Sequence, residues 1–247
     1  MIQIFKRWLS AGPADAAGNF KPVAVWAQAR DASFRTVHDG AGFVVEGRLG
    51  PTAWRMEWGP SQRRYIQGRE LRLRADLGAG AVDLQLLLIN RPLQEAMEAA
   101  VFDQYVEGVQ TRIDDQTPPE MRWLVMFPKL SGHDMGVLRQ AFVGVASSKI
   151  WLAQWLAGPL SGALATHVAA GNDASHPMVL MIGRGRLTLR TQLDEPGEKT
   201  LEVCLKLFET ALREAGRVAD QAAAPLAPST QPSLWSSSAM PSEEPVG

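Results

Sequence analysis

Hydrophobic and polar residues alternate strictly in two stretches of the chain, GRELRLRADL from Gly68 and GRGRLTLRTQL from Gly183. Successive side chains of an extended strand point to opposite faces, so this alternation predicts strands with leucine on one face and arginine on the other. A sheet built from such strands has an apolar core on one side and guanidinium groups on the other.

The same period of two extends through residues 43–49 and 52–58. In the second of these segments, Trp54 and Trp58 fall on the face opposite Arg55, so we expect both tryptophans in the core. Short turns containing glycine and proline join these segments to the first alternating stretch, which predicts an antiparallel meander. Further strands, more apolar and therefore more deeply buried, are predicted at 82–89, 122–127 and 178–182.

Between the strands, hydrophobic residues recur every three or four positions, which predicts amphipathic helices. Pro22 and Pro92 suit the first turns of two of them, and Asn90 and Asp194 are placed to cap the second and the last. Gly158-Pro159 is expected to break the helical pattern that surrounds it. The other helices are predicted to start at His133-Asp134, carrying Leu138, Phe142 and Val145, and at Ser147-Ser148.

Together these elements predict a single α+β domain over residues 21–218, with an antiparallel β-meander sheet and amphipathic helices packed on one face. A chain of 247 residues is long enough to bury such a core. Residues 1–20 are expected to form a flexible arm and 219–247, rich in Ala, Pro and Ser, a disordered tail. Because the two alternating stretches align without a gap, two weakly related strand-plus-helix halves, 21–117 and 118–218, stay open as an alternative.

The composition is that of an ordinary soluble globular protein, with 46% hydrophobic and 21% charged residues. A formal net charge of -1 argues against a dedicated nucleic-acid or membrane binder, so we expect neither partner. The 19 arginines against 6 lysines are typical of a GC-rich bacterial gene. Cys204 is the only cysteine, which fits a reducing, cytoplasmic compartment, and we expect its thiol to pack in the core.

The sequence carries no recognisable motif for catalysis, metal binding or nucleotide binding. Its four histidines are scattered, and HExxH, CxxC, GxSxG and glycine-rich phosphate loops are absent. We therefore assign no catalytic, cofactor-binding or metal-ligating residue and expect no cofactor.

The clearest chemical signal is a cluster of arginines in the meander, where residues 46–74 hold seven arginines but only three glutamates. Guanidinium groups bind phosphates and carboxylates through paired hydrogen bonds, so we expect an uncharacterised, non-enzymatic domain that binds a partner protein or an anionic ligand through this face. The competing interpretation is a solvated face, neutralised by cross-strand glutamates or by the acidic helix that carries Glu95, Glu98, Asp103 and Glu107. The candidate binding residues are Arg55, Arg63, Arg64, Arg72 and Arg74.

Two other functions stay open. An enzyme of unknown class, with its site between the two halves, would draw on His133, Asp134 or His38. A peripheral membrane protein would attach through the apolar segment 151–164. The longer stretch 150–172 has no charged residue other than a protonated histidine, but its glutamine, serine and Gly-Pro pair make it too polar for a membrane span.

Overall fold

The computed structural model describes residues 20–37, 41–106, 117–169 and 176–224, and the side chains of 101–106 are not part of this description. The N-terminal arm expected over residues 1–20 therefore lies, except for its last residue, outside the described residues. The same holds for the C-terminal tail beyond residue 224.

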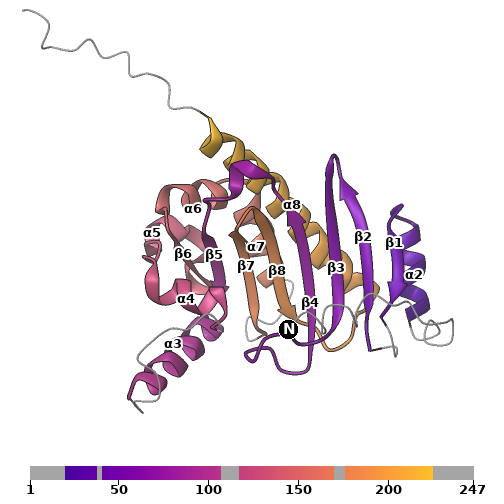
Figure 1. Cartoon of the computed structure of the whole chain (residues 1–247), viewed down its shortest axis with the longest axis horizontal. Coiled ribbons are helices and arrows are strands. Elements are labelled where there is room, and N and C mark those ends of the chain that lie inside the picture. Colours follow the sequence, from indigo (N-terminus) through magenta and orange to yellow (C-terminus); the bar gives the residue numbers. More distant parts are fainter. Residues whose placement is uncertain (1–19, 38–40, 107–116, 170–175, 225–247) are drawn as a thin grey trace, which may run out of the picture.

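The fold is built on an eight-stranded open sheet with the order β1-β2-β3-β4-β8-β7-β5-β6 (Figure 1). Every neighbouring pair of strands runs antiparallel. This arrangement confirms the α+β class and the antiparallel meander. The strands are β1 (Ser33–Thr36), β2 (Phe43–Leu49), β3 (Thr52–Pro60), β4 (Arg69–Asp76), β5 (Leu86–Asn90), β6 (Phe142–Ala146), β7 (Met178–Gly183) and β8 (Arg186–Gln192).

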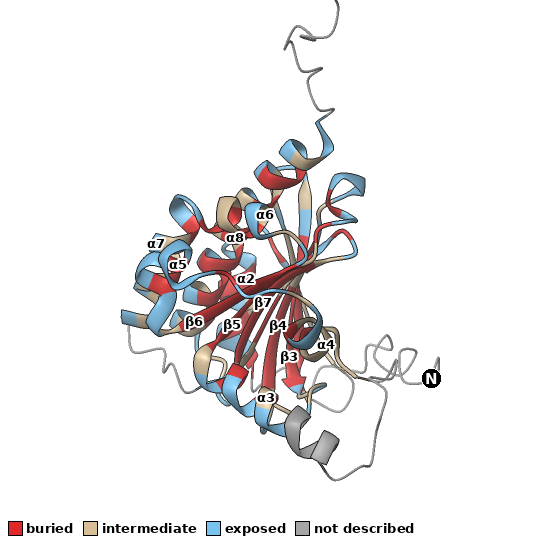
Figure 2. Ribbon diagram, turned by 90° about the vertical axis from the view of Figure 1, so that its left-hand side faces the viewer, coloured by how far each residue is buried: buried red, intermediate tan, exposed pale blue. Residues whose placement is uncertain are grey.

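Helices lie on both sides of this sheet, as the edge-on view in Figure 2 shows, with α7 and α8 on one side and α4 on the other. The main core forms on the side of α2, α6, α7 and α8. The α-helices are α2 (Lys21–Gln28), α3 (Arg91–Val106), α4 (Pro119–Met126), α5 (Gly132–Met135), α6 (Lys149–Leu156), α7 (Pro159–Ala169) and α8 (Glu198–Ala223), and the 3₁₀ helices are η3 (Ala79–Ala81) and η4 (Gly136–Gln140).

The alternating leucines point into the main core, as their period of two predicts. Leu73 and Leu189 are directly opposite each other on β4 and β8, and both are buried. Trp54 and Trp58 are also buried there, which confirms that these tryptophans belong to the core. Each fully buried side chain of this size contributes about 1.5–3 kcal/mol of hydrophobic stabilisation.

A second, smaller core covers the other face of β5, β6 and β7. These strands are apolar on both faces, so each face needs a cover that excludes water. Helices α3 and α4 supply it by packing Leu93, Met97 and Leu124 against Ile89 and Val145. The face of the sheet that points away from α8 is thus divided into an apolar half under α3 and α4 and a half formed by β2, β3, β4 and β8.

Two predicted elements are wrong in type. The segment 122–127, expected as a buried strand, lies almost entirely in helix α4, which starts at Pro119 and buries Glu120 and Leu124. The helix expected from His133 to carry Phe142 and Val145 ends by Gln140, and Phe142–Ala146 form strand β6. Short apolar runs carry no clear period, so helix and strand are not distinguishable from them.

The bounds of two elements also differ from expectation. Helix α8 starts after Gly197, not at Asp194, and it continues to Ala223, beyond the expected boundary at 218. The strand expected from residue 82 starts only at Leu86. Asn90 ends that strand, and its side chain ties β5 to the start of β7: Nδ2 donates to the His176 carbonyl at 3.0 Å and Oδ1 accepts from the Met178 N–H at 2.9 Å.

The apolar segment 151–164 is broken at Gly158-Pro159 as expected, since α6 ends at Leu156 and α7 starts at Pro159. Its large side chains face the protein interior: Trp155 is fully buried, and its indole N–H donates to the Ala211 carbonyl of α8 at 3.1 Å. Over the described part of the chain, no helix combines the length and the apolar composition needed to cross a membrane.

The packing of α4 on the sheet can be tested at Gly183, the last residue of β7. A Cβ atom at this position would lie 2.6 Å from the Trp123 ring of α4. Because the ring and its helix must shift to make room, we expect Gly183→Ala to lower the free energy of unfolding by about 1–3 kcal/mol, measured by urea denaturation.

Gly162→Ala is the matched control, since nothing lies within 4 Å of a Cβ at this exposed position of α7. Alanine is favoured over glycine inside a helix by roughly 0.5–1 kcal/mol, so this variant should be unchanged or slightly more stable. Equal stability of the two variants would contradict the contact between α4 and β7.

Candidate functional site

Arginines occupy directly opposite positions on the sheet half that α3 and α4 leave uncovered. Arg55 of β3 is paired with Arg74 of β4, and Arg72 of β4 is paired with Arg190 of β8. Like charges directly across from each other destabilise a sheet. Carboxylates placed between the guanidinium groups offset this repulsion.

Glu57 of β3 is the central carboxylate of this face. Its side chain is only 4% exposed, and it accepts hydrogen bonds from Arg55, Arg72 and Arg74, the last at 2.8 Å. Charge-assisted hydrogen bonds of this kind are about twice as strong as neutral ones. One buried carboxylate thus binds three arginines from two strands.

Two further glutamates complete the network. Glu46 of β2 accepts from Arg55 at 2.6 Å and lies 3.7 Å from Arg35. Glu70 of β4 pairs with Arg190, and both are buried. We call this network the charged face. It consists of Arg35, Glu46, Arg55, Glu57, Glu70, Arg72, Arg74 and Arg190.

The charged face has more positive than negative groups, with five guanidinium groups and three carboxylates. Burial, together with the charges of Arg190, Arg74 and Arg55, lowers the pKa of Arg72, which still stays protonated at neutral pH. Burial, together with the positive charges of Arg55 and Arg186, also lowers the pKa of Arg74. The Nε–H groups of Arg72 and Arg190 are buried without an acceptor among the described residues. The face is therefore short of negative charge.

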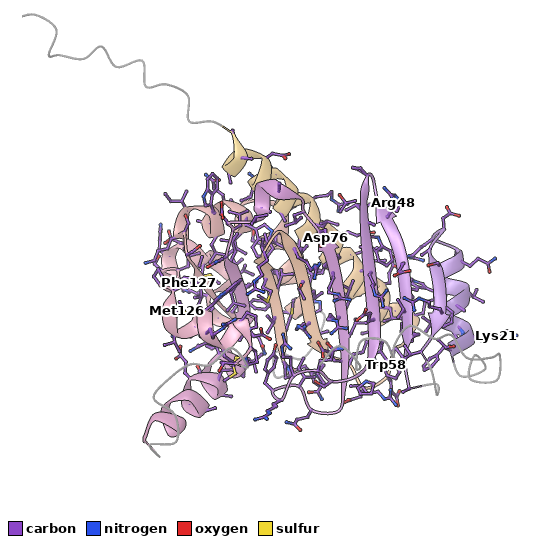
Figure 3. The ribbon with its side chains drawn as sticks, in the orientation of Figure 1. Lys21, Arg48, Trp58, Asp76, Met126 and Phe127 are labelled. Carbon is purple, nitrogen blue, oxygen red and sulfur yellow. The ribbon has the colours of Figure 1, made fainter. Side chains whose placement is uncertain are left out.

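An open groove of about 760 Å³ lies at one end of the charged face. Figure 3 shows two of its lining residues, Arg48 and Asp76, at the same end of the sheet. Arg74 and Arg55 reach into it from the charged face, and Arg186 pairs with Asp76 at 2.8 Å. Arg48 donates to the Pro51 carbonyl and forms no ion pair with any described residue. The groove is therefore open to solvent and is lined by four arginines and by the acidic residues Asp31, Glu46 and Asp76, and Arg48 is the one of these arginines without an ion pair to a described residue.

Of the five arginines that the sequence nominated, the structure brings Arg55, Arg72 and Arg74 together. Arg63 lies in the loop after β3, and its Nε donates to Oε1 of Glu120 at 2.6 Å. Arg64, in the same loop, is exposed and has no ion pair with the described residues. These two arginines are therefore not part of the charged face.

Glu120 is a structural anchor between the β3–β4 loop and helix α4. Its side chain is fully buried and accepts hydrogen bonds from Arg63 and from the Tyr65 hydroxyl. Burial opposes ionisation of this carboxyl, but Arg63 and the Tyr65 hydrogen bond outweigh it, so the pKa of Glu120 is lowered. Burial and the nearby Glu120 charge raise the pKa of Tyr65, which stays a hydrogen-bond donor.

Among the described residues, no carboxylate of the acidic helix pairs with these arginines, which was one of the two ways in which the solvated-face interpretation expected them to be neutralised. Glu98 of α3 pairs instead with Lys129 at 2.6 Å. The side chains of Asp103 and Glu107 lie outside the described residues. The neutralising carboxylates are the cross-strand glutamates, with Glu57 at the centre.

The sequence reasoning missed Arg190 and the role of Glu57. A signal for Arg190 was present, since it aligns with Arg74 in the two alternating stretches. Which arginine approaches which glutamate depends on the register of β3, β4 and β8, and that register is not visible in the composition of a strand.

The alternative catalytic residues are not brought to this site. His133 and Asp134 are exposed on the short helix α5, where Asp134 hydrogen-bonds Ser131. His38 lies outside the described residues. Over the described ranges, no group of three His, Cys, Asp or Glu side chains could hold a metal ion.

The fold and the site together define an α+β protein with an open antiparallel sheet and an ion-paired face. Comparison of the chain with family models, with curated proteins and with solved structures finds no match in any of the three. The interpretation of the site therefore depends on its own chemistry.

Glu57→Gln tests the dependence of the charged face on its central carboxylate. The amide keeps the shape of the side chain but leaves Arg55, Arg72 and Arg74 without their shared countercharge. Because uncompensated buried charge is costly, we expect the free energy of unfolding to fall by about 3–5 kcal/mol, measured by urea denaturation at pH 7.

The control is Glu98→Gln, which breaks the solvent-exposed pair with Lys129. Exposed ion pairs contribute about 0–1 kcal/mol, so this variant should be nearly as stable as the wild type. A Glu57 variant that is no less stable than the Glu98 variant would show that the three arginines do not need the carboxylate.

Glu120 should make the stability depend on pH in the acid range. Its pKa is lowered in the folded protein, so its stabilising effect is complete above its ordinary pKa of 4.5 and is lost as the pH falls through the lower folded value. We expect the stability difference between wild type and Glu120→Gln to be largest at pH 6–7 and to shrink below about pH 4.5.

The measurement is a series of urea denaturation curves at successive pH values, with the exposed Glu95→Gln as the control. A difference between wild type and Glu120→Gln that stays constant down to pH 3 would rule out the coupling between Glu120 and Arg63.

Proposed function

We propose that the protein is a non-enzymatic binding protein that holds an anionic group in the groove at the end of the charged face. The observation that carries this proposal is the surplus of guanidinium groups, five against three carboxylates, on a sheet half that no described helix covers. A carboxylate or phosphate in the groove would supply the missing negative charge.

The positions of Arg55 and Arg74 support a paired mode of binding. They are directly opposite each other on neighbouring strands, so their guanidinium groups approach the groove side by side. Planar guanidinium groups donate two parallel hydrogen bonds to a carboxylate or phosphate. An anion that bridges both would also relieve their mutual repulsion.

Both arginines are accessible to an incoming ligand. Their side chains are 27% and 24% exposed, whereas Arg72 and Arg190 are below 10%. The buried pair is held by Glu57 and Glu70, and the exposed pair makes the contact with the ligand. The acidic side chains of a partner protein and a small phosphate or carboxylate ligand present the same chemistry to this pair.

Arg55→Gln/Arg74→Gln tests the groove. Two probes separate the two sources of anion: a fluorescein-labelled hexaglutamate peptide, followed by fluorescence anisotropy, and inorganic phosphate, followed by calorimetry. Because a hydrogen bond to a charged group contributes about 1.5–3 kcal/mol, we expect the double variant to bind the probe at least roughly ten times more weakly than wild type. The affinity should also fall with rising salt.

The matched control, Arg139→Gln/Arg213→Gln, removes the same charge from exposed positions outside the groove and should bind like wild type. Binding of the peptide alone would identify a protein partner, and binding of phosphate alone a small ligand. If neither probe binds to wild type, or if the control loses as much affinity as the groove variant, the proposal fails.

A further inference from the structure

A second, more enclosed cavity of about 400 Å³ lies at the opposite end of the sheet from the groove. It is formed where β6 and β7 begin and β8 ends, and helices α7 and α8 close its sides. Figure 3 marks this end of the sheet by Trp58, whose indole donates to the Leu193 carbonyl at 2.6 Å. A volume of this size is within the range of small-molecule sites.

Part of the cavity lining is apolar, although polar side chains, the buried Asn90 among them, also line it. Phe142 and Met178 are buried to 2% and 5% exposure and form its floor, and Val168 of α7 and Leu193 add apolar walls. In small-molecule sites, apolar side chains of this kind bury the body of a ligand and polar groups fix its orientation.

The titratable side chains of the cavity include two carboxylates and two histidines, His167 and His176. Asp194 and Glu195 line its mouth, and no lysine or arginine is present among its described lining residues. The Oδ2 atom of Asp194 accepts a hydrogen bond from the Gln192 side chain at 3.4 Å. The cavity is thus opposite in charge to the groove.

Two titratable lining residues, His167 of α7 and Cys204 of α8, have shifted pKa values. Burial lowers the pKa of His167, which favours the uncharged imidazole. Burial also raises the pKa of Cys204 to about 12, so this residue stays a thiol, as expected for a packed cysteine. Neither group repels a cation, and a neutral imidazole nitrogen can accept a hydrogen bond.

From this arrangement we propose that the cavity binds a small organic cation, with a primary ammonium group between Asp194 and Glu195 and an apolar body against Phe142 and Met178. The carboxylates at the mouth supply the charge that selects the ammonium, and the floor supplies hydrophobic contact. This site is independent of the groove, because it lies at the other end of the sheet and shares no lining residue with it.

Three ligands of one shape and different charge test this assignment: 2-phenylethylamine, the neutral 2-phenylethanol and the anionic 3-phenylpropanoate. Binding to the full chain is measured by isothermal titration calorimetry at pH 7.5. Because a hydrogen bond to a charged group contributes more than a neutral one, we expect the amine to bind at least roughly ten times more tightly than either analogue. In Asp194→Asn/Glu195→Gln this preference should disappear.

The matched control, Glu209→Gln/Asp220→Asn, removes one Glu and one Asp from α8 outside the cavity and should keep the preference for the amine. Both positions of the site variant are exposed, so it should fold, which circular dichroism verifies. A wild type that does not bind the amine, or a preference that survives in the site variant, would overturn the proposal. Tighter binding of 3-phenylpropanoate would overturn it too, since the N-terminus of α8 would then set the charge preference.

Discussion

The charged half of the sheet depends on one buried carboxylate, Glu57. The register of β3, β4 and β8 places Arg55 opposite Arg74 and Arg72 opposite Arg190, an arrangement that is repulsive on its own. Transfer of a carboxylate out of water costs several kcal/mol, and a single ion pair seldom offsets that cost. Glu57 offsets it with hydrogen bonds from three guanidinium groups, which at the same time fix the relative positions of two strands.

The two halves of this sheet face are stabilised in different ways, one by apolar packing and the other by ion pairs. Over β5, β6 and β7 the face is apolar, and α3 and α4 exclude water from it. Over β2, β3, β4 and β8 the face is charged. Its arginine and glutamate side chains form ion pairs with one another, and no described helix lies above them. The Arg63–Glu120 pair joins the halves, because it ties the loop after β3 to α4. The boundary of α4 thus decides where the open, charged surface begins.

The small net charge of the chain conceals a strong separation of charge within the fold. The groove is lined by four arginines and three acidic residues, whereas the cavity at the opposite end of the sheet has Asp194 and Glu195 and no lysine or arginine among its described lining residues. Electrostatic recognition depends on such local excess and not on the total. A formal net charge of -1 is therefore compatible with two sites of opposite preference in one domain.

The sequence by itself determined the sheet, the direction of its core and the place of Trp54 and Trp58 in it, because alternation with a period of two is a local property of each strand. It also nominated Arg55, Arg72 and Arg74. It did not distinguish α4 or β6 from the opposite type of element, since short apolar runs have no clear period. Only the tertiary structure decided which carboxylate neutralises which arginine, and it brought Phe142, His167 and Asp194 to one cavity. The physical reason is that strand register and the packing of helices on the sheet bring together residues far apart in the chain, and no local pattern records those distances.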